Sequence, residues 1–148
     1  MEKKYIAEFL GTFFLVATVI GSGIMGDDLS AGNEAVALLG NTIATGAILF
    51  VIIKSFENLS GAHFNPIVSI VFYLLKEINL KDLIFYLAIQ FVAGLLAVLS
   101  IHFIFEQSLL QIASKPRTGL SMFFSEIIAS VGLILTILMV RKNNKSNV

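Results

Sequence analysis

The chain has 148 residues, of which 57% are hydrophobic and 14% are charged, and its mean hydropathy is +0.90. A soluble domain of this size carries about 25% charged residues, so the composition indicates a membrane protein. The formal net charge is zero, which gives no support for a nucleic-acid partner. The sequence has no cysteine, only two histidines, and no motif for a phosphate loop, a dinucleotide-binding turn or a hydrolase nucleophile. We therefore expect no disulfide and no metal site, and we do not expect an enzyme.

Four apolar runs predict membrane-spanning helices, because a span needs about 20 apolar residues to match ~30 Å of hydrocarbon. In chain order these runs are 5–25, 35–53, 83–105 and 120–140. The first run follows two lysines, as the apolar part of a secretory signal does. It is long for a cleaved signal and no Ala-x-Ala-like site closes it, so we interpret it as a retained span. Polar loops are expected at 26–34, 76–82 and 106–119, with a solvated tail at 141–148.

Residues 60–75, SGAHFNPIVSIVFYLL, predict half a span. Asn65 is a good helix N-cap, and Pro66 suits the first helical position, where its missing N–H costs nothing. Ten helical residues rise ~15 Å, half the hydrocarbon thickness. We expect residues 60–64 to descend as extended backbone and a half-helix over 66–75 to return to the same face. Carbonyl groups on that backbone, beside the positive end of the half-helix dipole, would make a polar lining for a pore.

The distribution of basic residues predicts the orientation, since lysine and arginine concentrate on the cytoplasmic side of short loops. With a cytoplasmic N-terminus, eight basic residues lie inside, namely Lys3, Lys4, Lys54, Lys76, Lys81, Arg141, Lys142 and Lys145. Only Lys115 and Arg117 lie outside. This bias holds only if the half-helix does not cross the membrane. We expect both termini, and the tail at 141–148, to be cytoplasmic.

Four segments resemble the aquaporin and aquaglyceroporin family, the major intrinsic proteins. SGAHFNPIVS at 60–69 closely matches the first Ser-Gly-Ala-His-x-Asn-Pro-Ala-Val loop of that family, and AEFLGTFFLV at 7–16 matches its first-span signature. YLAIQFVAG at 86–94 is similar to the third-span pattern. SEIIASVGLILTI at 125–137 looks like an inverted repeat of the first-span signature, with Glu126 in the place of Glu8.

The resemblance covers essentially the whole chain and implies an all-α integral membrane fold. The family has six spans and two re-entrant half-helices, whereas this chain offers four spans and one half-helix. We therefore expect a single, partial aquaporin-like domain over residues 1–148, truncated relative to the family fold. A second Asn-Pro-Ala is missing, as is the selectivity arginine of the family, and Ile67 stands where the motif usually has alanine.

The same resemblance implies roles for the loop residues. Asn65 would donate its amide N–H to permeating water or solute while its oxygen caps the half-helix that begins at Pro66. Gly61, Ala62 and His63 would present their carbonyl groups to the pore. Two alternatives remain open from the residues alone. Asn65 could be a plain helix cap at an interfacial turn, and the His63 side chain could face lipid headgroups.

Roles are also implied for four residues on the spans. Glu8 and Glu126 would hold the pore-loop backbones, and Gln90 would pack and form hydrogen bonds between helices. Thr45 lies twenty residues before Asn65, at the second-span selectivity position, where threonine in place of an aromatic residue indicates a wider passage. As alternatives, each glutamate could reach water from near a span end. Thr45 could equally be a small residue at a helix contact.

The implied function is passive permeation of water or small neutral solutes such as glycerol, without a cofactor. Selectivity would come from pore width and hydrogen-bond donors. The expected surroundings are the lipids of the cell membrane, and the expected partners are a tetramer of like chains or a complementary half-chain. One rival is a truncated, non-conducting subunit or relic that needs a partner with the second Asn-Pro-Ala half. Another is an ion-coupled transporter, which would need ionisable groups near the midplane, whereas Glu8 and Glu126 are predicted near span ends.

Overall fold

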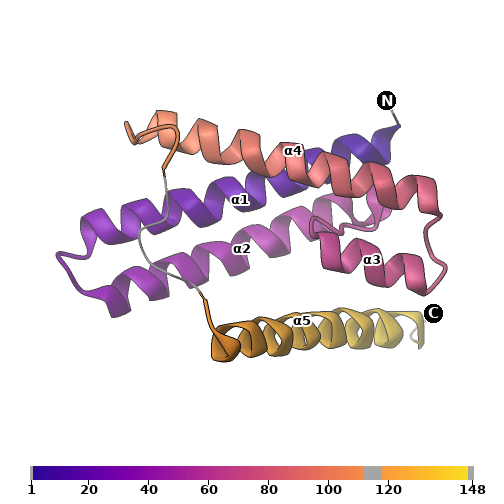
Figure 1. The fold of residues 1–148 in the computed structure, drawn as a ribbon. Coiled ribbons are helices and arrows are strands. Elements are labelled where there is room, and N and C mark those ends of the chain that lie inside the picture. The colour runs from indigo at the N-terminus through magenta and orange to yellow at the C-terminus, as the bar shows by residue number, and fades with distance from the viewer. Residues whose placement is uncertain (1, 112–117, 147–148) are drawn as a thin grey trace. The chain divides into compact units, whose positions relative to one another are not determined.

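The computed structural model describes residues 2–111 and 118–146, and these residues form five α-helices and no β-strand (Figure 1). The helices are α1 (Lys3–Leu29), α2 (Glu34–Ser60), α3 (Pro66–Leu74), α4 (Leu80–Ile104) and α5 (Leu120–Ser146). Four of them, α1, α2, α4 and α5, are long and apolar enough to cross a membrane. The predicted all-α fold of four long helices and one half-length helix is thereby confirmed. Lys115 and Arg117, the two basic residues expected on the outer side, lie outside the described residues.

The chain divides into two compact units. Residues 1–111 hold helices α1 to α4, and residues 112–148 hold α5. Nearly all of the predicted site residues belong to the first unit, and only Glu126 belongs to the second.

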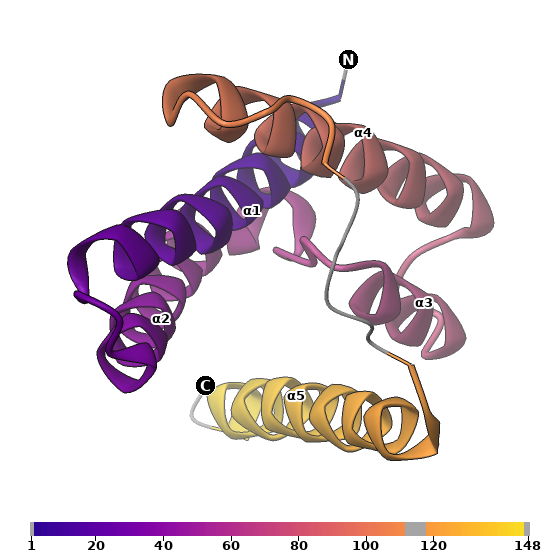
Figure 2. The same cartoon turned by 60° about the vertical axis from the view of Figure 1, so that its left-hand side comes forward.

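Within the first unit, α1 and α2 form an antiparallel pair joined by a short turn at residues 30–33. Helix α4 lies against α1 and runs in the same direction, and the short helix α3 packs against α4 (Figures 1 and 2). Small residues allow the close approach of α1 and α2, because a Cβ atom added to Gly26 would lie 3.1 Å from the carbonyl oxygen of Ala37. This packing brings the N-terminal ends of α1 and α4 beside the loop that precedes α3.

Three asparagine caps determine where helices begin. The Asn33 side chain accepts hydrogen bonds from the backbone N–H groups of Ala35 and Val36 at the start of α2. Asn65 accepts from the N–H of Ile67 at 2.8 Å, and Asn79 accepts from the N–H of Asp82 at 2.8 Å. Each cap satisfies backbone donors that have no partner within the helix. The predicted start of the half-helix at Asn65 and Pro66 is therefore correct to the residue.

The apolar runs predicted the long helices but not their ends. Helix α2 continues from the expected end at residue 53 to Ser60, and α1 continues to Leu29, so the expected loop at 26–34 shrinks to residues 30–33. Helix α5 extends to Ser146, and it therefore includes the first six residues of the solvated tail expected at 141–148. Hydropathy marks only the part of a helix that suits hydrocarbon, whereas backbone hydrogen bonding continues through charged turns until a cap ends it.

The distribution of side chains in the first unit is inverted relative to that of a soluble protein. Large apolar side chains face outward, for example Leu38, Phe50 and Phe91, each about two-thirds exposed. The buried set combines apolar residues, such as Phe72 and Tyr86, with the polar side chains of Glu8, Thr12, Ser60, His63, Ser69, Asp82 and Gln90. An apolar exterior suits lipid, and the buried polar groups find partners within the protein, except the Thr12 hydroxyl and Oε1 of Gln90, which have none among the described residues.

Candidate pore site

Residues 61–64, between α2 and α3, contain no helix, turn or bend, but they depart from the expected uniformly extended backbone, and Ser60 still belongs to α2. Gly61 ends α2 with φ 84°, and Ala62 and Phe64 also have positive φ, at 53° and 49°. Left-handed backbone costs non-glycine residues of the order of 1 kcal/mol or more. The loop holds this conformation because tertiary contacts compensate for the strain, and the strongest of them come from Glu8.

The carboxylate of Glu8 binds the loop at its centre. One oxygen, Oε1, accepts hydrogen bonds from the Ser60 hydroxyl at 2.7 Å and the His63 backbone N–H at 2.9 Å. The other, Oε2, accepts from the Phe64 backbone N–H at 2.8 Å and the Gln90 side-chain amide at 2.9 Å. The side chain is fully buried, and it does not reach water as the alternative interpretation requires. Glu8 thus joins α1 to the end of α2, to the loop and to α4.

A second layer of polar side chains surrounds this carboxylate. The Gln90 amide also donates to the Ser69 hydroxyl on α3 at 3.0 Å, and that hydroxyl lies 3.1 Å from Nδ1 of His63. The imidazole of His63 is buried, with its ring centroid 4.5 Å from that of Phe72 and 5.2 Å from that of Tyr86. Its side chain therefore points into the protein and not toward lipid headgroups. The loop and the first half of α3 form one hydrogen-bonded body with α4.

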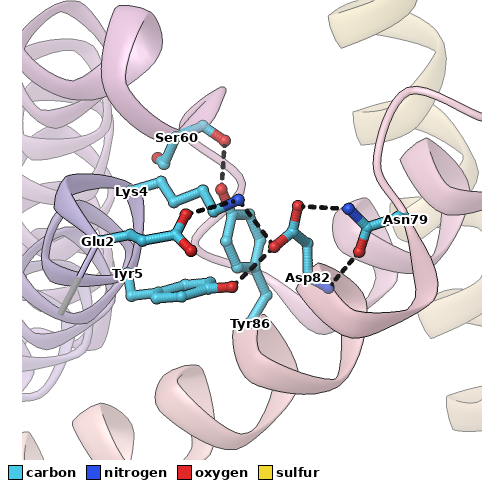
Figure 3. A network of polar contacts seen from close by, with 7 residues as sticks. All are labelled: Glu2, Lys4, Tyr5, Ser60, Asn79, Asp82 and Tyr86. Atoms are coloured by element: carbon cyan, nitrogen blue, oxygen red, sulfur yellow. Dashed lines mark hydrogen bonds and ion pairs between the residues drawn. The ribbon is translucent and has the colours of Figure 1, made fainter.

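A further group of polar contacts, centred on Asp82, lies beside the loop at the start of α4 (Figure 3). Sequence reasoning missed this group. Asp82 accepts a hydrogen bond from the Tyr5 hydroxyl at 2.7 Å and pairs with the Lys4 ammonium at 2.8 Å. Asn79 donates to its other oxygen at 3.1 Å. Asp82 falls in the polar loop expected at 76–82, but its spacing of three residues after the Asn79 cap is a signal of a helical first turn.

Tyr86 connects this cluster to the loop. Its hydroxyl donates to the Ser60 carbonyl oxygen at 2.9 Å, and its ring lies edge-on to Tyr5 at 6.0 Å (Figure 3). The Ser60 hydroxyl in turn accepts from the N–H of Ala62 at 3.1 Å. The loop is therefore held from both α4 and α1.

Some polar groups of the loop and of its helix cap are not used by the contacts described above. The oxygen of Asn65 is occupied by the N–H of Ile67, but its amide nitrogen donates no hydrogen bond to any described residue. The side chain is half-buried, and the neighbouring Gly61 and Pro66 are exposed. Within the described part of the chain, no hydrogen bond is donated to the carbonyl oxygens of Gly61 and Ala62. The arrangement offers one amide donor and a short row of acceptors.

Thr45 lies away from the loop network, and Glu126 belongs to the other unit. Thr45 is a half-buried residue of α2, and its hydroxyl donates to Oδ1 of Asn41 at 3.2 Å. The side-chain amide of Asn41 donates to the carbonyl oxygen of Val19 on α1 at 3.1 Å. Glu126 is an exposed residue of α5 in the second unit. The structure therefore brings Glu8, Gln90, His63 and Asn65 together around one loop.

Comparison with known proteins agrees with this architecture. The sequence model described as major intrinsic protein matches residues 1–148. The chain is 44% identical over 138 residues to aquaglyceroporin AqpS of Rhizobium meliloti (strain 1021), covering 93% of this chain and 59% of that protein. It is 32% identical over 155 residues to glycerol uptake facilitator protein-like 6 of Lactiplantibacillus plantarum, covering 98% and 66%. It is 29% identical over 147 residues to aquaporin NIP6-1 of Arabidopsis thaliana, covering 99% and 47%.

The chain thus spans about half to two-thirds of the length of these relatives. The match over all 148 residues confirms the resemblance carried by the Ser-Gly-Ala-His-Phe-Asn-Pro loop. With four helices long and apolar enough to cross a membrane, the chain is an integral, multi-pass membrane protein that belongs to the major intrinsic protein family.

Proposed function

We propose that this chain forms part of a channel for passive permeation of water or small neutral solutes such as glycerol. The observation that carries the proposal is the hydrogen bonding of the Asn65 side chain. Its oxygen caps α3, while its amide nitrogen has no partner among the described residues. Relatives named as aquaporins, an aquaglyceroporin and a glycerol uptake facilitator support a conducting role over the non-conducting alternative. No chemical reaction is required of the chain.

The geometry suggests how such a passage would work. Because the Ile67 N–H engages the Asn65 oxygen, the side chain is oriented to offer its amide N–H groups to a permeant. The carbonyl groups of Gly61, Ala62 and His63 would accept, so a water or hydroxyl group meets both partners. Asn65 and Pro66 stand at the positive end of the α3 dipole, which disfavours cations there. Thr45 would border the passage on α2.

The buried polar residues would serve as supports. Glu8 and Gln90 would keep the strained loop in shape, since the carboxylate saturates the loop N–H groups that would otherwise be unsatisfied. By resemblance, Glu126 on α5 would do the same for a second pore loop. The whole chain would then be one aquaporin-like domain.

Orientation and assembly form part of the same proposal. The protein would lie in the plasma membrane. Both termini and the segment 141–148 would be cytoplasmic, because eight of the ten basic residues then lie inside. The channel would be a tetramer of like chains, or it would be completed by a complementary half-chain.

The test is osmotic shrinkage of vesicles that contain the protein purified from its own host membranes, in sucrose and in glycerol. Asn65→Ala removes the cap and the donor, and Asn65→Asp keeps a cap acceptor but replaces the amide donor by a carboxylate. We expect both variants to lower the flux, by up to about tenfold for the loss of one hydrogen bond.

The matched control is Asn33→Ala, which removes the cap of α2 and should leave flux unchanged. Full flux in both Asn65 variants would show that Asn65 does not contact the permeant. Wild-type vesicles no faster than empty ones would contradict the channel itself.

A further inference from the structure

A relay of two side-chain hydrogen bonds joins α1 to Thr45 on α2. The amide nitrogen of Asn41 donates to the carbonyl oxygen of Val19 at 3.1 Å. The Thr45 hydroxyl donates to Oδ1 of Asn41 at 3.2 Å. All three residues are half-buried. The relay therefore couples a backbone group of α1 to the residue that the proposed function places beside the passage.

The direction of this relay follows from the chemistry of its first partner. A backbone carbonyl oxygen can only accept, so the atom of Asn41 that faces Val19 must be its nitrogen. The amide oxygen then points along α2 toward Thr45, one helical turn on. That oxygen is also only an acceptor, so the Thr45 hydroxyl donates its single hydrogen to Asn41. What remains on Thr45 is a pair of acceptor lone pairs.

Thr42 shows that this arrangement is particular to Thr45. The hydroxyl of Thr42 donates to the Leu38 carbonyl of its own helix at 2.8 Å, which is the usual local bond of threonine in a helix. The Asn41 amide has room beside α1 because residue 23 is glycine. A Cβ atom added to Gly23 would lie 3.0 Å from the Asn41 nitrogen. The absence of a side chain at Gly23 on α1 therefore leaves space for the Asn41 amide.

We propose that Asn41 is a positioning residue that makes Thr45 a hydrogen-bond acceptor toward the passage, and that the channel therefore favours polyols, whose hydroxyl groups donate. This inference rests on the proposed function. A polyol can donate to Thr45 at one point of the passage and accept from Asn65 at another, whereas a neutral solute of similar size without O–H or N–H groups can satisfy only Asn65. Asn41 itself need not touch the solute.

The experiment compares glycerol with dimethyl sulfoxide, which accepts hydrogen bonds but does not donate them. Fluxes are measured in vesicles with the protein purified from its host membranes, after subtraction of the flux through protein-free vesicles. We expect Thr45→Val to lower the ratio of glycerol to dimethyl sulfoxide flux about threefold to tenfold, as the loss of one hydrogen bond would. Thr45→Ser keeps the hydroxyl and should keep the ratio, and Thr42→Val is the matched control.

Asn41→Leu should lower the ratio as Thr45→Val does, and the double variant should lower it no further, because Asn41 acts through Thr45. A normal ratio in Asn41→Leu, or a further fall in the double variant, would overturn the inference. If Asn41→Leu does not accumulate in the membrane, Gly23→Ala takes its place, because it crowds the Asn41 amide and is judged by the same criteria. Absence of wild-type flux would instead refute the proposed function.

Discussion

The ring of Phe64 occupies the space that a side chain would need at Gly11. A Cβ atom built on Gly11 would overlap three atoms of that ring. Phe64 is buried, has φ 49°, and packs edge-on against Phe56 with a centroid distance of 6.1 Å. The missing side chain on α1 therefore makes room for the residue that immediately precedes Asn65.

Gly11→Ala should displace the loop. Overpacking of this kind costs about 1–3 kcal/mol, and the expected results are a lower thermal midpoint and a lower flux. Gly46→Ala is the matched control, because a Cβ atom there would meet nothing within 4 Å. Adding Phe64→Ala to Gly11→Ala removes the overlapping ring and should recover part of the flux. No recovery would indicate that the two residues act separately.

Glu8→Gln should destabilise the protein although it is nearly isosteric. The new NH₂ group must face either Ser60 and His63 or Phe64 and Gln90, each of which presents donors to the carboxylate. A buried donor left without an acceptor costs about 1–3 kcal/mol. Thermal unfolding in detergent measures the loss. Glu57→Gln, at an exposed pair with Lys54, is the control and should have little effect. Equal midpoints in the two variants would contradict the role of Glu8.

Asp82→Ala should loosen the contact between α1 and α4. It removes the acceptor of both Tyr5 and Lys4, and hydrogen bonds to charged groups contribute about 1.5–3 kcal/mol. The expected result is a lower unfolding midpoint, with faster hydrogen exchange at the start of α4. Lys3→Met, at an exposed lysine next to Lys4, serves as the control. An unchanged midpoint in Asp82→Ala would show that the cluster adds nothing to stability.

Single cysteines can test the orientation, because the sequence contains none of its own. With cytoplasmic termini, a membrane-impermeant thiol reagent added to intact cells should label Ser30→Cys and should not label Glu77→Cys or Asn144→Cys. Permeabilised cells, in which all three sites should react, provide the control. Labelling of Glu77→Cys in intact cells would mean that α3 crosses the membrane.

Local chemistry explains which parts of the fold could be predicted from the sequence. The Asn65 and Pro66 pair predicted the first residue of α3, because a cap and a proline act within one turn. The end of α2 was misplaced by seven residues. Apolarity stops near Ile53, whereas the helix ends only where Gly61 adopts left-handed backbone.

Contacts between distant segments explain what could not be predicted. The positive φ of Ala62 and Phe64 depends on Glu8 and Gly11, which lie more than 50 positions earlier. Asp82 looked like a linker residue because its partner Tyr5 is 77 positions away. Glu8 was placed near a span end by its position in the apolar run, and the structure shows that it is nevertheless fully buried.

The four donors that surround Glu8 are not synthesised at the same time. Oε1 serves Ser60 and His63, and Oε2 serves Phe64 before it serves Gln90. Three of the four donors therefore leave the ribosome within a few residues of one another, long after Glu8 and well before α4 is complete. The loop can close on α1 while only the first two long helices are in the membrane. The arrival of Gln90 then adds the last donor to a contact that already exists, so a chain stalled before residue 90 would already hold the loop against α1.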